Sequence, residues 1–215
     1  MSLSPDPLVS ELTDMVADPD YPCLGARSVF NRERATVRAF DELGTPAAAA
    51  ALRRQLARFA ERTDVGAGFA SFLAVFRAPA IRDEAHFEEL LWRQLQHLHD
   101  GDSVSWAPEV SHDPADPYFA FSVGGTAYFV VGLHPRASRL ARRSASPVLV
   151  FNLHQQFESL RRSDAYPRMR DTIRKRDLRL QGSLNPMVAD HGTTSEARQY
   201  AGRRVGERWR APFVP

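Results

Sequence analysis

Cys23, the single cysteine of the chain, is the first residue whose type could carry chemistry. Pro22 restricts the backbone before it and Gly25 allows a turn after it, so the thiol can face a pocket at a bend. A thiolate placed in this way can act as a nucleophile or as a ligand for a metal or a haem. A free cysteine also commonly packs as a small buried hydrophobic residue. The local sequence leaves both interpretations open.

Two histidines each follow a leucine at the end of an apolar run. His134 stands in Gly-Leu-His and His154 in Asn-Leu-His, and Glu158 lies four residues after His154. If the two runs are parallel or staggered strands, the imidazoles converge, and Glu158 shares the face of His154 if a helix starts there. Two histidines and one carboxylate suit a non-haem iron centre. The alternative is one strand-end histidine bonded to the backbone and another that is exposed.

Arginine supplies 27 of the 28 basic residues, with Lys175 as the exception, which is also what codon bias produces. Residues 136–179 hold twelve basic and four acidic residues, although the net charge of the chain is only +2. Arg136 and Arg139 follow an apolar run and could bind a carboxylate, a phosphate or haem propionates, or could lie in a solvated loop. Because aspartates interrupt the basic segment and no nucleic-acid motif accompanies it, we expect no nucleic-acid partner.

The elements that position these residues follow from their apolar patterns. A helix is expected from Thr45-Pro46, a buried strand over 69–76, a helix after Asp83 and a loop over 100–117. Gly124-Gly125 separates two strand-like runs, 118–123 and 126–134, and predicts a tight hairpin. In that register Val123 opposes Thr126, Phe121 opposes Tyr128 and Phe119 opposes Val130. A further strand is expected over 148–153, with helices over 158–160 and 169–180.

The fold class indicated is α+β, a single domain with a mainly antiparallel sheet flanked by helices, since the expected strands are too close together for βαβ crossovers. Residues 1–20, with five acidic and no basic residues, read as an acidic N-terminal arm, and residues 21–215 as the domain. The irregular tail after residue 183 is expected to pack back through Met187, Tyr200, Trp209 and Phe213.

The composition excludes several classes of protein. With 43% hydrophobic and 25% charged residues, the 215-residue chain is typical of globular proteins, and no apolar run is long enough to cross a membrane. The absence of a basic leader and of paired cysteines favours a cytoplasmic location. The sequence also has no dinucleotide, P-loop, zinc-protease, serine-hydrolase or paired-cysteine signature.

Four segments together resemble the YqcI/YcgG family. They are residues 21–28 (YPCLGARS), 119–139 (FAFSVGGTAYFVVGLHPRASR), 147–158 (PVLVFNLHQQFE) and 182–209 (GSLNPMVADHGTTSEARQYAGRRVGERW). The resemblance implies haem b, because members of the family are associated with it. Some members are haem-dependent oxygenases that hydroxylate nitrogen in guanidino compounds, including arginine and the guanitoxin precursor.

The resemblance also implies roles for particular residues. Cys23 becomes the first choice for the haem iron ligand, with His154 and His134 as rivals. The other candidates are Arg27, Arg136 and Arg139 for the propionates; Tyr128, Phe129 and Phe151 for the haem walls; Glu158 and Glu196 for a guanidinium substrate; and Arg198, or Arg139, for a substrate carboxylate. Ala211 stands where some relatives have a cysteine, which puts an identical chemistry in doubt.

Three functions are therefore carried forward. The first is a haem-dependent N-hydroxylase acting on a guanidino or amino compound, with O₂ or peroxide as oxidant. Because no flavin or ferredoxin motif is visible, its electrons come from an electron-transfer partner or are replaced by peroxide. The second is a non-enzymatic haem sensor or carrier, and the third is a non-haem iron oxygenase that uses His134, His154 and Glu158. Assembly as a homodimer is left open.

Overall fold

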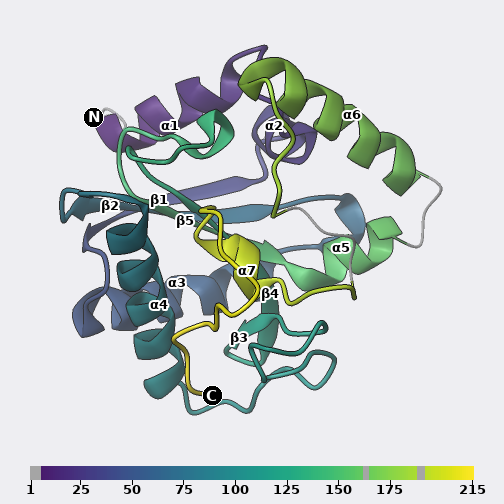
Figure 1. Ribbon diagram of the computed structural model, residues 1–215. Coiled ribbons are helices and arrows are strands. Elements are labelled where there is room, and N and C mark those ends of the chain that lie inside the picture. The colour runs from purple at the N-terminus through teal and green to yellow at the C-terminus, as the bar shows by residue number, and fades with distance from the viewer. Residues whose placement is uncertain (1–5, 162–164, 188–191) are drawn as a thin grey trace.

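The computed structural model describes residues 6–161, 165–187 and 192–215 (Figure 1). Across this part of the chain, five strands form one sheet in the order β1-β2-β5-β4-β3. Only the β1–β2 pair is parallel, which confirms a single α+β domain with a mainly antiparallel sheet. The strands are β1 (Ala35–Glu42), β2 (Ser71–Ala78), β3 (Phe121–Val123), β4 (Thr126–Leu133) and β5 (Val148–Leu153).

The parallel pair corrects the expectation that the chain has no βαβ crossover. Helix α3 (Pro46–Arg62) connects β1 to β2, and Ala35 lies beside Ser71 in their parallel register. Strand β1 escapes the sequence pattern because it is an edge strand, in which Arg38, Asp41 and Glu42 interrupt the apolar residues. The predicted helix at Thr45-Pro46 is confirmed: Thr45 caps α3 by accepting the Ala48 amide.

The hairpin is confirmed with most of its predicted register. Gly124 and Gly125 have φ of 61° and 70°, a region that glycine enters without steric cost. Val123 pairs with Thr126 and Phe121 with Tyr128. The predicted pairing of Phe119 is wrong, because the amide of Phe119 donates to the carbonyl of Asp116 in a turn and β3 begins only at Phe121.

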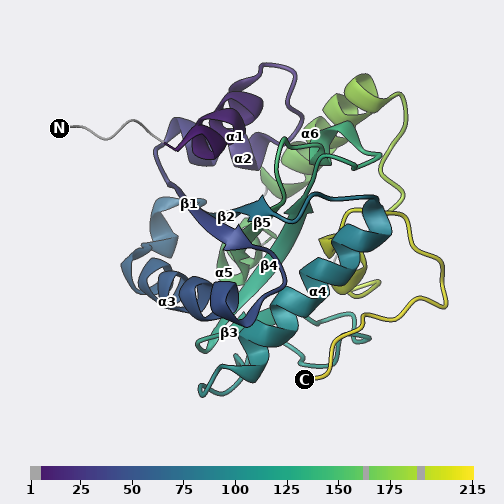
Figure 2. The same ribbon diagram turned by 90° about the vertical axis from the view of Figure 1, so that its left-hand side faces the viewer.

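The sheet separates two layers of helices (Figure 2): α3 and α4 (Glu84–Asp100) lie below it, and α1 (Pro7–Ala17), α2 (Leu24–Asn31) and α6 (Ala165–Gln181) lie above it. Alternate strand residues face the two layers. Phe72, Tyr128 and Phe151 join the large core under α3 and α4, whereas Leu73 and Leu133 join a smaller cluster on the α1 side.

Helix α1 (Pro7–Ala17) occupies most of the segment that was expected to be an acidic arm. Leu12 and Val16, four residues apart, are both buried, and Leu12 belongs to the smaller cluster on the sheet. The prediction of an arm outside the domain is therefore wrong for residues 7–17. The helix was missed because its apolar residues lie on one face at helical spacing and are separated in the sequence by acidic and polar residues.

The remaining helices are α2 (Leu24–Asn31), α5 (His154–Arg161), α6 (Ala165–Gln181) and α7 (Ala197–Tyr200). Tyr200 and Phe213 are buried in the main core and Trp209 packs against it, so these predicted tail contacts are confirmed. Met187 is half-buried, and its backbone amide donates to Asn185. No helix in the described residues is long and apolar enough to span a lipid bilayer.

Candidate functional site

A cavity of about 610 Å³ lies on the face of the sheet away from α3 and α4. Phe129, Val131 and Leu133, the alternate residues of β4, contribute its sheet wall. The other walls come from the start of α2, from the end of the short helix Leu140–Arg142, from α5, from α6, and from residues 184–185 and 194–199. The lining residues from these walls are Tyr21, Pro22, Cys23, Ala141, Arg142, Phe157, Leu160, Arg161, Met169, Arg170, Ile173, Arg174, Asp177, Leu184, Asn185, Thr194, Glu196 and Gln199.

Cys23 lines this cavity at the start of α2. Cys23 is half-buried, and its Sγ accepts a hydrogen bond from the Ala26 amide at 3.4 Å, so the thiol caps the helix. The neighbouring Tyr21 hydroxyl donates to the Ala141 carbonyl at 3.3 Å, and burial raises the pKa of Tyr21 far above its ordinary value. The structure thus places the one cysteine of the chain at a cavity wall, where its sulfur can meet a ligand.

The two candidate strand-end histidines do not converge. In the antiparallel β4–β5 pair, Leu133 lies beside Val148 and Leu153 beside Tyr128. Leu133 and Leu153 are thus five residues apart along the pair, roughly 17 Å at a rise of about 3.4 Å per residue, and His134 and His154 lie beyond them at opposite ends. The iron centre of His134, His154 and Glu158 is therefore wrong, and the described residues contain no cluster of three metal-ligating side chains.

Neither histidine lines the cavity. His134 is 1% exposed and stacks on Phe87 of α4 at a centroid distance of 4.2 Å. Burial lowers the pKa of His134 to about 4. His154 is buried at the first residue of α5, with Nε2 4.0 Å from Glu158 Oε1. Both histidines, the other candidates for the haem iron ligand, thus lie outside the cavity that Cys23 lines.

The two predicted acids meet through an arginine that the sequence analysis did not select. Arg161 of α5 donates to Glu196 Oε1 at 3.3 Å and also forms an ion pair with Glu158. Glu196 is buried and lines the cavity, whereas the Glu158 side chain is 38% exposed and does not. The structure therefore separates two residues that looked equivalent: Glu196 lines the cavity, and Glu158 contacts Arg161 from outside it.

Of the three aromatic residues expected to wall a haem, only Phe129 lines the cavity. Phe129 lines the cavity, where its ring lies 5.6 Å from that of Phe157. Tyr128 and Phe151 face the opposite layer, where the Tyr128 hydroxyl donates to Leu56 and the two rings meet edge-on. As neighbours in the strand, Tyr128 and Phe129 point to opposite faces of the sheet, so both cannot wall one ligand.

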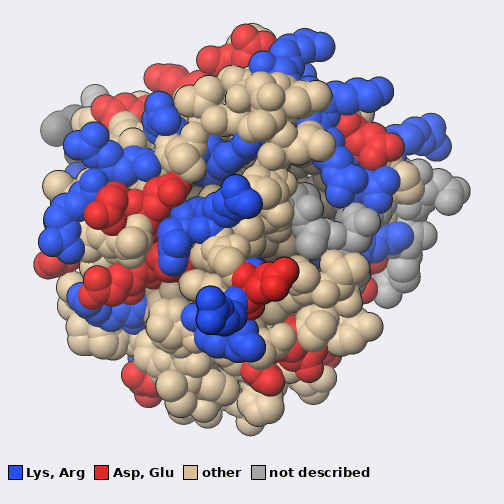
Figure 3. Space-filling model, viewed as in Figure 1, with Lys and Arg blue, Asp and Glu red and all other residues tan. Residues whose placement is uncertain are grey.

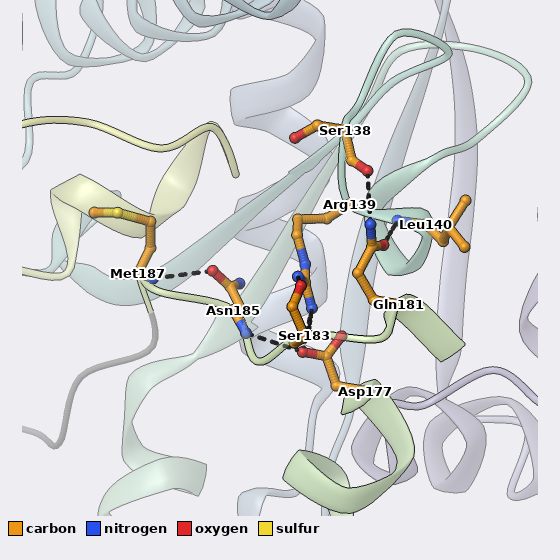
Figure 4. Close-up of polar contacts among 8 residues, drawn as sticks. All are labelled: Ser138, Arg139, Leu140, Asp177, Gln181, Ser183, Asn185 and Met187. Carbon is orange, nitrogen blue, oxygen red and sulfur yellow. Dashed lines mark hydrogen bonds and ion pairs between the residues drawn. The ribbon is translucent and has the colours of Figure 1, made fainter. Parts of the chain in front are cut away.

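Arg139, which was expected to bind a haem propionate, has its partners within the protein. It is buried, forms an ion pair with Asp177 of α6 and donates to Ser183 Oγ at 3.0 Å. Figure 4 shows this contact beside a second one, in which Gln181 accepts from the Leu140 amide at 2.7 Å. A buried guanidinium needs such compensation. Arg139 therefore attaches α6 to the chain after β4 and does not line the cavity.

The other three predicted arginines also lie outside the cavity. Arg27 donates to the Pro19 carbonyl at 3.2 Å. Arg136 is exposed in a separate cleft beside Glu84. Arg198 donates to the Gly206 carbonyl at 2.9 Å and lies over the Trp209 ring.

Four arginines that the sequence analysis passed over line the cavity instead: Arg142, Arg161, Arg170 and Arg174. Arg142 donates to the carbonyls of Gly132, Gln199 and Tyr200, and burial lowers its pKa. The basic excess of residues 136–179 was the available signal, because all four lie within it.

The fold and site define an α+β protein with a cavity that is largely apolar, lined by arginines and bordered by a cysteine. Residues 12–214 match the model of the YqcI/YcgG family, and the chain belongs to that family. It is 26% identical to YqcI of Bacillus subtilis (strain 168) over 176 residues, which cover 77% of this chain and 68% of YqcI. It is 27% identical to YcgG of the same organism over 181 residues, which cover 80% of this chain and 71% of YcgG. No solved structure matches the chain.

Proposed function

We propose that the chain binds haem b in this cavity, with the Cys23 thiolate as axial ligand, and that it hydroxylates a nitrogen of a guanidino or amino compound. The observation that carries the proposal is the position of Cys23, whose side chain borders a large apolar cavity in the fold. A thiolate ligand favours cleavage of the O–O bond, the chemistry that an oxygenase requires.

The residues of the cavity fit a haem group in three respects. The volume of about 610 Å³ lies within the range of roughly 300–1,000 Å³ that is usual for ligand and cofactor sites. Phe129, Phe157 and Ile173 offer apolar surface for a porphyrin. The Ala26 amide donates to Cys23 Sγ, and hydrogen bonds to the ligand are one way in which proteins tune a haem.

Bound haem would supply the redox chemistry with O₂ or peroxide, while the chain binds and orients the substrate. Glu196 is the carboxylate placed to receive a guanidinium, and Arg161 fixes its orientation through the 3.3 Å contact. With O₂, one oxygen atom is inserted into the N–H bond and the other leaves as water, which consumes two electrons from a partner and two protons from the solvent. With peroxide no external electrons are needed.

The experiment loads the protein with haemin and adds L-arginine or agmatine, with O₂ and a reductant or with peroxide. A product heavier by one oxygen atom supports the N-hydroxylase. Haem binding with no spectral response to either compound and no product would contradict the enzyme and favour a sensor or carrier. Failure of the protein to bind haemin would overturn the whole proposal.

A further inference from the structure

We infer that another cavity of the molecule, between β1 and α3, binds a small molecule that carries phosphate groups. Its volume of about 400 Å³ lies within the range of roughly 300–1,000 Å³ that is usual for ligand sites. Figure 2 shows β1 above α3 in this part of the molecule. We call it the arginine cleft, because it is lined by Arg34, Arg38, Arg58 and Arg62. It shares no lining residue with the cavity that Cys23 lines, so this inference goes beyond the proposed function and does not depend on it.

The fold brings the four arginines together from three segments. Arg38 lies in β1 on the same face as Phe40, which is buried in the core under α3. Arg58 and Arg62 are four residues apart in α3, about one helical turn, so they point to the same side of the helix. Arg34 lies directly before β1 and contacts the segment that leads from α3 to β2. The guanidinium groups thus reach the arginine cleft from different walls.

Arg34 is held in place without being neutralised. Its guanidinium donates to three backbone carbonyls, those of Asp64 at 2.6 Å, Phe69 at 3.0 Å and Gly68 at 3.2 Å. A carbonyl has no net charge, so the positive charge remains at the wall. Within the part of the chain that the structure describes, none of the four arginines forms an ion pair. Figure 3 shows a different arrangement over one face of the molecule, where many basic side chains lie next to acidic ones.

The charges that line the arginine cleft favour an anion. Its two acidic residues are Glu33, which is exposed, and Asp64, whose Oδ1 accepts from the Gly66 amide at 2.8 Å. Against the four arginines, these two acids leave a net of two positive charges. The C-terminal end of α3 also borders the cleft and contributes roughly half a negative charge. That contribution is too small to reverse the sign, so a bound anion is stabilised.

The arrangement of the donors favours phosphate over a carboxylate. A phosphate group presents strong acceptor oxygens in a tetrahedral arrangement, so it can accept from guanidinium groups on several walls at once. The two oxygens of a carboxylate lie in one plane and match a single guanidinium. The cleft also holds neutral donors in Thr36 and Gln55, whereas its apolar lining is limited to Phe59 and Ala70. The ligand is therefore recognised by its phosphate groups and not by an apolar body.

The first test is isothermal titration calorimetry with pyrophosphate, on wild type and on the Arg58→Gln/Arg62→Gln variant. Both side chains are exposed, so this variant should fold like wild type. The control is Arg53→Gln/Arg54→Gln, which removes two charges from the same helix outside the arginine cleft. We expect the first variant alone to bind pyrophosphate about tenfold more weakly, because hydrogen bonds to charged groups contribute that much or more. No binding by wild type, or an equal loss in both variants, would overturn the inference.

The second test removes an acid and should have the opposite effect. Glu33→Gln takes a negative charge out of the arginine cleft, so pyrophosphate should bind more tightly than to wild type. Glu61→Gln, which alters an exposed acid of α3 that does not line the cleft, is the control and should leave the affinity unchanged. Equal affinities of these two variants would place the anion outside the cleft and contradict the inference.

The third test identifies the chemistry of the ligand with ADP and citrate. If ADP binds more tightly than pyrophosphate, the cleft recognises a nucleotide, and if the two bind equally, it recognises phosphate groups alone. Either result supports the inference. Citrate is a carboxylate anion of comparable charge and should bind more weakly than pyrophosphate. Citrate that binds as tightly as pyrophosphate would overturn the assignment to phosphate.

Discussion

Arg139 and Asp177 form an ion pair that is nearly closed to solvent, with side-chain exposures of 9% and 14%, and it joins α6 to the segment after β4. Near the same end of α6, Asp177 also accepts from the Asn185 amide at 3.2 Å, and Gln181 accepts from the Leu140 amide at 2.7 Å. The pair therefore helps to hold the wall that α6 contributes to the cavity.

Removing one member of this pair should loosen α6. We expect Asp177→Asn to lower the free energy of unfolding by about 3 kcal/mol, because it leaves a buried guanidinium without its counter-ion. The rate of hydrogen exchange of the α6 amides should rise, and urea unfolding should show the loss of stability. Asp171→Asn, on the same helix and with a side chain 56% exposed, is the control and should change stability by less than about 0.5 kcal/mol. Equal effects of the two substitutions would refute the anchoring role.

Glu196 and Glu158 should respond differently to substitution. Glu196→Gln removes the carboxylate that lines the cavity, and we expect it to weaken the binding of a guanidino compound to the haem-loaded protein about tenfold or more. Glu158→Gln, outside the cavity, should change that affinity less than about threefold. The measurement is a titration of the haem spectrum with L-arginine. A larger effect at Glu158 would contradict the placement of the substrate.

His134 should make the protein less stable in mild acid. Its pKa is lowered from 6.5 to about 4 by burial against Phe87, with Glu84 opposing the shift and Arg142 adding to it. Between these two pKa values, His134 is therefore protonated in the unfolded chain and neutral in the folded chain. The contribution of neutral His134 to the free energy of unfolding is complete above pH 6.5. It falls as the pH drops towards 4, by up to about 1.4 kcal/mol per pH unit.

The check is urea unfolding at pH 7 and pH 5. The loss of stability between the two should be smaller in His134→Gln than in wild type. It should be unchanged in His112→Gln, which alters an exposed histidine. An identical pH dependence in all three proteins would show that His134 titrates normally.

Gly132 should not tolerate a side chain. An added Cβ would lie 2.5 Å from Phe87 Cε1 and 2.9 Å from Leu91 Cδ1. We expect Gly132→Ala to destabilise the fold by about 1–3 kcal/mol through overpacking of α4 against β4. Gly206→Ala meets no atom within 4 Å and is the matched control. The measurement is the thermal unfolding midpoint of both variants. A Gly132→Ala protein as stable as wild type would contradict this packing.

The local pattern was enough to predict the hairpin, the capped helix at Thr45 and the strand 148–153, because each depends on residues that are close in sequence. Strand β1 was missed because an edge strand alternates too weakly to stand out. The order and direction of strands are long-range properties. The convergence of His134 and His154 was therefore a guess about topology, and the antiparallel register refuted it.

The candidate site was predicted in part for the same reason. Cys23 and Glu196 could be selected from the sequence, because one is the single cysteine and the other lies in a characteristic segment. Both line the cavity. The arginines could not be sorted, since Arg139 and Arg174 look alike until the structure shows that one neutralises Asp177 and the other lines the cavity.

The central claim is that Cys23 ligates haem, and the absorption spectrum of the haemin-loaded protein tests it most directly. Because the chain has one cysteine, Cys23→Ser removes the only thiolate available. We expect a Soret band that, after reduction in the presence of CO, moves to the long-wavelength position of thiolate ligation in wild type and not in Cys23→Ser. A wild type without a Soret band, or two proteins with identical spectra, would contradict it.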